Sequence, residues 1–257
     1  MDVRSYNRTA WTREVEKKNM WTVPVTSEVI EAARRGQWQI VLTPLKSVPR
    51  NWFPPDIHGR DVLCLASGGG QQGPVLAAAG ANVTVLDNCP AQLQQDRMVT
   101  DRDGLALTLI EGDMACLDMF PDENFDLIVH PVSNVFSQHV RQVWSEAFRI
   151  LRKGGSLLSG FCNPINFIFD YELYEKGQLE VKYSIPYSDL TSLDDVTLQS
   201  RLAEGEPLEF GHSLQDQIGG QIDVGFVISG FYEDGTANDV LSKFIPWLIA
   251  TKADKPL

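Results

Sequence analysis

The stretch Asp61-Val-Leu-Cys-Leu-Ala-Ser-Gly-Gly-Gly-Gln-Gln-Gly73 decides how the fold of this chain is read. Residues 62–66 are apolar, as is typical of a buried parallel strand, and the glycines that follow predict a turn before a helix over 71–79. Because glycine has no side chain, a ligand can lie against such a turn and meet the free N–H groups at the helix start. The stretch therefore predicts a cradle for a ligand.

A carboxylate follows the next predicted strand, which covers residues 83–86. Asp87 ends this strand and comes 19 residues after Gly68 (87 − 68). In open parallel sheets, an acid at this place accepts hydrogen bonds from the two hydroxyls of a ribose. The spacing therefore predicts a cofactor that contains adenosine.

Strands and helices continue to alternate along the chain. After Asn88, the predicted cap of a helix, strands are expected over 107–110, 125–129 and 156–161. A helix with one apolar face starts near Val140, and 153–155 is expected to end it. This rhythm predicts an α/β fold with a doubly wound, mostly parallel sheet.

The C-terminal part predicts a different ending. A helix is expected over 212–224, a strand over 225–232, a short helix over 238–244 and a final strand over 247–251. A link this short between two strands suits an antiparallel pair better than another parallel crossover.

Composition limits the class of protein. The chain has 257 residues, of which 43% are hydrophobic, and this predicts one substantial core. The net charge of −12 disfavours nucleic acid as a partner. No run approaches the roughly 20 apolar residues of a membrane span, and the first residues lack the apolar segment of a secretory signal, so a cytoplasmic protein is expected. The four widely spaced cysteines predict reduced thiols and no metal site.

Two segments lie outside the alternating pattern. Residues 1–60 are predicted to form an aromatic-rich arm, with a helix capped by Thr26 or Ser27 that stops at Gly36. This arm either covers a sheet edge and packs there, or closes Trp11 or Trp21 over the cofactor. Residues 162–210 are predicted to form a lid-like insertion on the core 61–257, with a surface excursion as the alternative.

Residues 61 to about 252 together resemble the class I S-adenosylmethionine-dependent methyltransferases, in particular their small-molecule group. The resemblance implies a Rossmann-like, seven-stranded, mostly parallel sheet of order 3-2-1-4-5-7-6 whose last strand is antiparallel. It also implies S-adenosyl-L-methionine as the cofactor and a small-molecule methyl acceptor as the partner. The matching pieces are the glycine motif at 65–70, the ribose carboxylate Asp87, the adenine contact Asp113-Met114, the fourth strand at 125–129 and the turn at 151–155.

The cofactor-binding residues that the resemblance implies are Ala66, Ser67, Gly68, Gly70, Gln71, Asp87, Asn88, Asp113, Met114 and His130. The chain departs from the family pattern at Cys64, where an acid usually helps to hold the cofactor's amino group, and at Ala66, where a glycine is usual. Either Ser67, the amides of 71–72, the His130 carbonyl or the aromatic arm replaces the acid, or cofactor binding is weakened.

Candidate catalytic residues follow the fourth strand. His130 can accept a proton near neutral pH, and Asn134 or Ser133 can orient a substrate, although His130 can equally pack beside the cofactor. We predict a methyltransferase that acts on a small molecule. The alternatives are an NAD(P)-dependent oxidoreductase, for which a Tyr-x-x-x-Lys pair is missing, and a non-catalytic S-adenosylmethionine-binding protein. The acceptor atom and the oligomeric state stay open.

Overall fold

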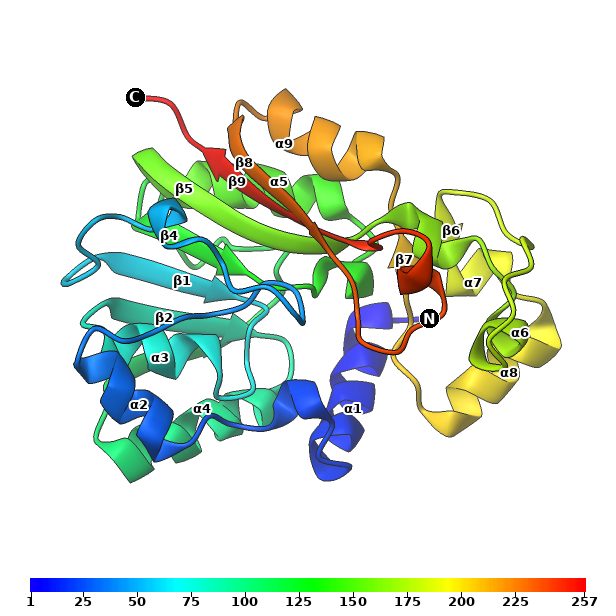
Figure 1. The fold of residues 1–257 in the computed structure, drawn as a ribbon, viewed down its shortest axis with the longest axis horizontal. Helices are drawn as coiled ribbons and strands as arrows, with labels where there is room; N and C mark the ends of the chain where they lie inside the picture. Colours follow the sequence, from blue (N-terminus) through cyan, green and yellow to red (C-terminus); the bar gives the residue numbers. More distant parts are fainter.

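The computed structural model describes residues 1–257 around a seven-stranded sheet of order β3-β2-β1-β4-β5-β9-β8 (Figure 1). Strand β9 runs antiparallel to both of its neighbours, and the other pairs are parallel. The bounds are β1 Asp61–Leu65, β2 Asn82–Asp87, β3 Leu107–Glu111, β4 Phe125–His130, β5 Leu151–Cys162, β8 Val227–Asp234 and β9 Leu248–Asp254. Because β8 and β9 are the sixth and seventh strands of this sheet, the predicted order 3-2-1-4-5-7-6 with an antiparallel last strand is confirmed.

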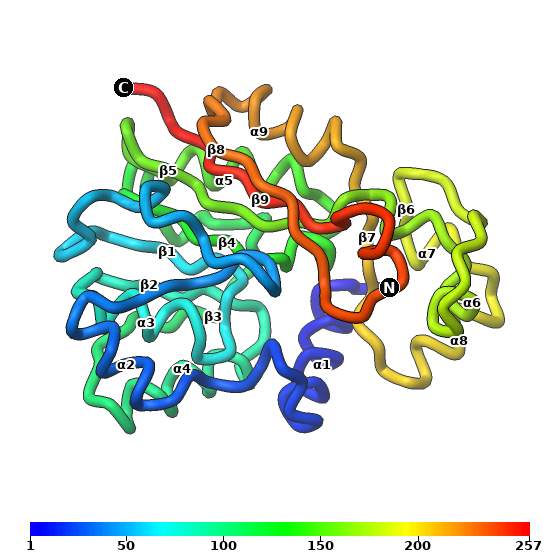
Figure 2. The backbone as a smooth tube through the Cα atoms, viewed as in Figure 1, coloured from blue at the N-terminus to red at the C-terminus, as the bar shows by residue number.

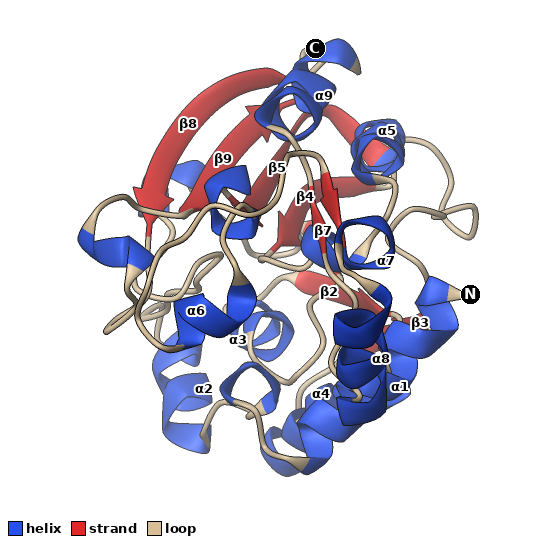
Figure 3. Cartoon of the chain, turned by 90° about the vertical axis from the view of Figure 1, so that its right-hand side faces the viewer, coloured by secondary structure: helices blue, strands red, loops and turns tan.

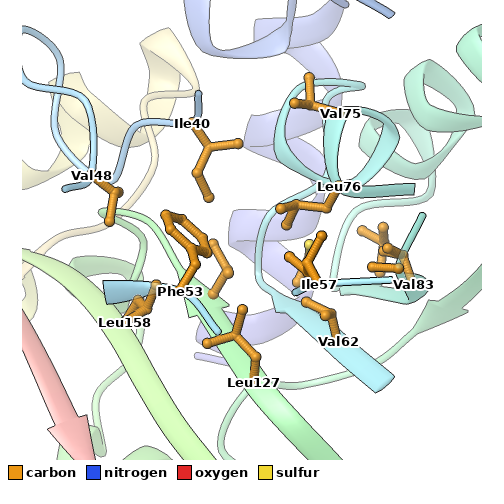
Figure 4. Close-up of a cluster of buried hydrophobic side chains, with 14 of the residues drawn as sticks. Ile40, Val48, Phe53, Ile57, Val62, Val75, Leu76, Val83, Leu127 and Leu158 are labelled. Carbon is orange, nitrogen blue, oxygen red and sulfur yellow. The ribbon is translucent and has the colours of Figure 1, made fainter. Parts of the chain in front are cut away.

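Each face of the sheet has its own apolar core, because successive side chains of a strand point to opposite faces. In β1, Val62 and Cys64 belong to one core, whereas Leu63 and Leu65 belong to the other. Figure 4 shows the first core, in which Phe53 from the segment before β1 lies among strand and helix side chains. The buried strand predicted at the start of the glycine motif therefore anchors both layers.

Helices cover both faces of the sheet. Helices α2, α3 and α4 contribute buried residues to the first core, and α5 contributes to the second. Figure 3 shows α5 and α9 well separated from α2 and α3. The bounds are α2 Ser27–Arg34, α3 Gln72–Ala78, α4 Pro90–Asp103, α5 Val140–Ile150 and α9 Gly220–Asp223. Single turns of other helix types lie at Met20–Thr22, Arg50–Trp52, Asn134–Phe136, Pro164–Phe167, Gln215–Gly219 and Leu241–Lys243.

The junction between α5 and β5 differs from the prediction. Residues 153–155 do not end the helix, because α5 ends at Ile150 and the strand begins at Leu151. A Cβ at Gly155 would lie 2.8 Å from the Asp126 carbonyl oxygen of the neighbouring strand. This glycine therefore permits close strand packing rather than a helix stop.

The C-terminal predictions are correct in order but not in helix length. Where one helix was expected over 212–224, a π-helical turn at Gln215–Gly219 leads into the short α9. The expected helix over 238–244 is a single turn at Leu241–Lys243. No helix of the chain is long and apolar enough to cross a membrane.

The N-terminal arm begins with a helix that the sequence pattern did not indicate, α1 at Val3–Glu16. Figure 2 shows it between α4 and the insertion. Val3 forms a small apolar cluster with Leu208 and Phe210 of the insertion. The arm therefore touches a part of the chain some 200 residues away.

The insertion lies at the right of Figure 1, and its Phe167, Tyr187 and Leu193 share an apolar cluster with Val135 and Leu248 of the core. Its two short strands pair antiparallel, with Tyr187 opposite Gly211. Its elements are α6 Tyr171–Glu175, β6 Tyr187–Ser188, α7 Asp189–Ser192, α8 Asp195–Glu204 and β7 Phe210–Gly211.

Candidate functional site

A cavity of about 440 Å³ lies at the carboxyl ends of the central strands, where ligands bind in sheets of this kind. Residues of the sheet edge, of α1 and of the insertion line it together. Eight of the predicted cofactor residues line this cavity: Ala66, Ser67, Gly68, Gln71, Asp87, Asn88, Asp113 and Met114. Gly70, His130 and Asn134 do not belong to its lining.

The turn after β1 is shaped for close approach. Ala66 adopts a φ of +47°, which is unusual for a residue with a side chain. A Cβ at Gly68 would lie 2.7 Å from the Gln92 Cβ and 3.0 Å from a carboxylate oxygen of Asp87. Only glycine therefore fits between the strand end and α4 at this point.

Asp87 lies at the end of β2, where the sequence places a ribose contact. Its Oδ2 accepts from the Gly68 N–H at 2.9 Å, and its Oδ1 accepts from the Cys89 N–H at 2.9 Å. Burial raises the pKa of Asp87, while these backbone donors oppose the rise. Each oxygen keeps a lone pair for a further donor. Gln92 also lines the cavity, and its buried Oε1 has no hydrogen-bond partner within the chain.

The segment after β3 is tied to Asp87 through the backbone. The Gly112 N–H donates to the Asp87 carbonyl at 3.0 Å, which brings the two strand ends together. The carboxylate of Asp113 accepts from the Ala115 N–H at 2.9 Å. Met114 packs against the second core and also lines the cavity. Asp113 and Met114 therefore line the same cavity as Asp87, and the prediction that they contact an adenine stays a prediction.

Two amides occupy the region near the missing acid. The Ser67 hydroxyl donates to the Gln72 Oε1 at 3.2 Å, and both residues line the cavity. Gln71 donates through its Nε2 to the carbonyls of Met20 and Val23, each at 3.0 Å, and so holds the arm against the turn.

Cys64 is fully buried in the first core, and burial raises the pKa of its thiol. The thiol therefore does not take the place of the acid.

A buried acid behind the turn escaped the sequence analysis. The Oδ2 of Asp96 accepts from the Gly69 N–H at 3.0 Å, while its Oδ1 has no partner. Burial raises the pKa of Asp96 to about 8, and the charge of Asp87 adds to the rise. Asp96 lies on α4, nine residues after Asp87. It shares the buried face of α4 with Leu93 and Val99, and an acid at such a position is the one sequence signal for its contact with the glycine turn.

The catalytic roles predicted for His130 and Asn134 find no support in their placement. The His130 ring is fully buried, meets Trp144 edge-on at 6.0 Å, and its Nδ1 donates to the Leu65 carbonyl at 2.9 Å. Burial lowers its pKa to about 4, so it is a weak base. Asn134 is also fully buried and exchanges two amide hydrogen bonds with Gln217. Strand alternation explains the first result, since His130 shares its face with Ile128 rather than with the cavity.

The arm supplies one wall of the cavity. Trp11 and Trp21 both line it, and the rings of Trp11 and Phe136 meet edge-on with their centroids 5.1 Å apart.

Asn88 does not cap α4 as predicted, because Cys89 occupies that position. Instead the Asn88 side chain accepts from the Arg4 Nε at 3.0 Å and donates to the Arg4 carbonyl at 2.9 Å. The arm is thus fixed directly to the end of β2.

The insertion also contributes to the cavity lining, with Phe167 and Glu209 among its residues. Periodicity gave no signal for Glu209, because it lies in a short segment whose partners are distant in the sequence. No group of histidine, cysteine and acidic side chains in the chain could hold a metal ion.

Comparison with known proteins finds similarity to methyltransferases. A family model described as a methyltransferase domain matches residues 63–159. A Bacillus subtilis (strain 168) protein named "Uncharacterized methyltransferase YbaJ" is 55% identical over 251 residues, which are 98% of each chain. A demethylmenaquinone methyltransferase of Tropheryma whipplei (strain Twist) is 33% identical over 121 residues, 45% of this chain and 48% of that one. The crystal structure of an S-adenosylmethionine-dependent methyltransferase from Mesorhizobium loti has the same fold, with a TM-score of 0.58 and 19% identity over 79% of this chain and 94% of that one.

Proposed function

Because the chain belongs to the class I S-adenosylmethionine-dependent methyltransferases, with S-adenosylmethionine as cofactor, we propose that it methylates a small molecule held beneath the insertion. The observation that carries this proposal is the continuity of one cavity from Asp87 at the sheet edge to Phe167 of the insertion. A cavity of about 440 Å³ is in the range of small-ligand sites.

The residues at the sheet edge fit the cofactor. Asp87 has free lone pairs for ribose hydroxyls, and the unpartnered Oε1 of Gln92 is a further acceptor. Asp113 and Met114 would meet the adenine, and the Ser67–Gln72 pair would meet the amino-acid end in place of the usual acid. When bound, the cofactor supplies a methyl group made electrophilic by its positive sulfur.

The chain's own residues would then act mainly by positioning and by exclusion of water. Alignment of the acceptor with the bond that breaks contributes most of the rate in such a displacement. The aromatic walls from Trp11, Phe136 and Phe167 favour an apolar acceptor and a dry site. The relative that acts on demethylmenaquinone supports a small-molecule acceptor in the same way.

Charge argues against a nucleic-acid acceptor. Arg4 is the one Lys or Arg side chain in the cavity lining, and its guanidinium already donates to Asn88. A net charge of −12 adds general repulsion of phosphate backbones.

Calorimetric titration with S-adenosylmethionine, S-adenosylhomocysteine and NAD(H) tests the cofactor site. We expect both sulfur compounds to bind and Asp87→Ala to weaken them roughly 100-fold, since hydrogen bonds to a charged group contribute about 1.5–3 kcal/mol each. Asp87→Asn keeps the shape and is expected to lie between the two. Asp101→Ala, the same change on the exposed side of α4, is the control and should bind as the wild type does.

Two outcomes would contradict the proposal. Binding of NAD(H) instead of the sulfur compounds would favour oxidoreductase chemistry. Binding of S-adenosylmethionine without formation of S-adenosylhomocysteine, across a broad set of small metabolites, would favour a non-catalytic binding protein.

A further inference from the structure

The cavity lining contains three acidic residues, and Glu209 is the one that comes from the insertion. The other acids of the lining, Asp87 and Asp113, lie at the sheet edge, where backbone N–H groups already donate to them. The carboxylate of Glu209 has no hydrogen bond and no ion pair within the chain. Glu209 is therefore the lining acid whose carboxylate has no partner of its own within the chain.

The backbone of Glu209 is held on both sides. Its N–H donates to the Asp189 Oδ2 at 2.8 Å, and its carbonyl accepts from the Asp189 N–H at 3.1 Å. Asp189 is fully buried and also accepts from the Tyr187 hydroxyl at 2.7 Å. The preceding residue, Leu208, donates its N–H to the Asn7 side chain at 2.8 Å and is fully buried. Glu209 therefore stands on a rigid support, as a residue that must meet a ligand needs.

The surroundings of Glu209 are mostly apolar. Cys162, Phe167 and Leu248 line the same cavity and belong to one apolar cluster. Arg201 is the cation whose charge acts on Glu209. Its guanidinium lies 3.7 Å from the Asp189 carboxylate and forms no ion pair with Glu209. Burial raises the pKa of Glu209 to about 7, with Asp189 adding to the rise and Arg201 opposing it. A carboxylate in such surroundings gains much from a hydrogen-bond donor on the ligand.

We propose that Glu209 binds the hydroxyl hydrogen of the methyl acceptor, and that this acceptor is an apolar, ring-bearing molecule with an O–H group. This inference rests on the proposed methyltransferase function and specifies the acceptor class. The ring is favoured by the aromatic lining, which includes Trp11, Phe136 and Trp247. Because Glu209 has no competing partner, a neutral hydroxyl can donate to it without displacing another contact.

The same contact gives Glu209 a role in transfer. As the acceptor oxygen forms its bond to the methyl carbon, the bond between that carbon and the positive sulfur breaks and leaves a neutral thioether. The hydroxyl proton moves to an Oε atom of Glu209, from which it later passes to water. A carboxylate with a raised affinity for protons suits this task.

The test uses phenol and its methyl ether anisole, which have the same ring but differ in the hydroxyl donor. Binding to the full chain, saturated with S-adenosylhomocysteine, is measured by NMR titration. We expect phenol to bind at least about tenfold more tightly than anisole, as a hydrogen bond to a charged group predicts. In Glu209→Leu the two affinities should agree within about twofold, and Glu209→Gln should retain part of the preference. Glu204→Leu, the same change at an exposed site of the insertion, should behave as the wild type does.

Several results would overturn the inference. Equal affinities in the wild type, including no measurable binding of either compound, would do so, as would a preference that survives in Glu209→Leu. Benzylamine is the third probe: if Glu209→Leu weakens it more than phenol, the acceptor is cationic rather than a hydroxyl compound. Calorimetry of S-adenosylhomocysteine is run on each variant. If the wild type does not bind S-adenosylhomocysteine, the proposed function is contradicted. If it binds S-adenosylhomocysteine but does not prefer phenol to anisole, only this inference is contradicted.

Discussion

Replacement of Gly70 by alanine is expected to disturb the joint between the glycine turn, α4 and the N-terminal arm. Gly70 has a φ of +72°, and a Cβ there would lie 2.9 Å from the Gln95 carbonyl oxygen and 2.9 Å from the Pro24 Cβ. Neither neighbour moves easily, because Gln95 is part of the α4 backbone. Pro24 precedes Val25, whose N–H donates to the Gly70 carbonyl at 3.0 Å. Alanine at this position must therefore push two elements apart.

Gly104 provides a matched control for this change. It ends α4 with a φ of +63°, and a Cβ there would meet nothing within 4 Å. Both alanine variants bear the left-handed conformation, which costs about 1 kcal/mol. Only Gly70→Ala adds overpacking, which typically costs about 1–3 kcal/mol. We expect the free energy of unfolding to fall by about 1 kcal/mol in Gly104→Ala and by about 2–4 kcal/mol in Gly70→Ala.

Urea denaturation followed by circular dichroism, without ligand, measures both losses. The midpoint should shift further for Gly70→Ala, while the slope m stays the same in all three proteins. Equal shifts in the two variants would refute the steric reasoning, because they would leave only the shared conformational cost.

Three further predictions concern the surroundings of the site. Asn7→Ala removes two buried hydrogen bonds to the Leu208 backbone and should lower the free energy of unfolding, measured in urea, by about 2 kcal/mol. An unchanged midpoint would show that these bonds do not stabilise the contact between α1 and the insertion. The raised pKa of Asp96, about 8, means that the folded chain keeps a proton which the unfolded chain releases near pH 4. Stability should therefore fall as pH rises from about 4 to about 8, by on the order of 1 kcal/mol per unit, and Asp96→Asn should flatten this fall in denaturation measured across that range. His130→Ala should lower the Tm by leaving a cavity beside Trp144, yet change the affinity for S-adenosylhomocysteine less than about twofold; a tenfold loss with unchanged Tm would restore a direct role.

The sequence sufficed for the sheet because each strand carries its own pattern. The apolar runs, the glycine turn and Asp87 are local signals, and the right-handed crossover rule then leaves few arrangements. The same locality explains why eight predicted cofactor residues line one cavity, since the carboxyl ends of parallel strands meet at one edge.

Helix α1 escaped prediction because its buried face is partly polar. Asn7 and Glu14 are buried beside Val3 and Ala10, so no apolar period marks the helix. Asn7 is buried because it bonds to Leu208, a partner that the sequence alone does not indicate.

The placement of His130 follows from strand alternation, a local rule that the sequence does contain. His130 directly precedes the loop that lines the cavity, but alternation along β4 turns its side chain toward Trp144. Gly155 misled in a similar way, because a glycine that lets two strands approach looks the same in sequence as one that stops a helix.

The reciprocal bonds between Asn7 and Leu208 bear on how this protein can be recombined with its relatives. A chimaera that receives only residues 162–210 from another family member would set a foreign wall against the native first helix. The transplant should therefore include residues 1–16, although they are distant from the insertion in the sequence. If the cavity holds the acceptor as we propose, its lining can be exchanged between relatives only when both segments are exchanged together.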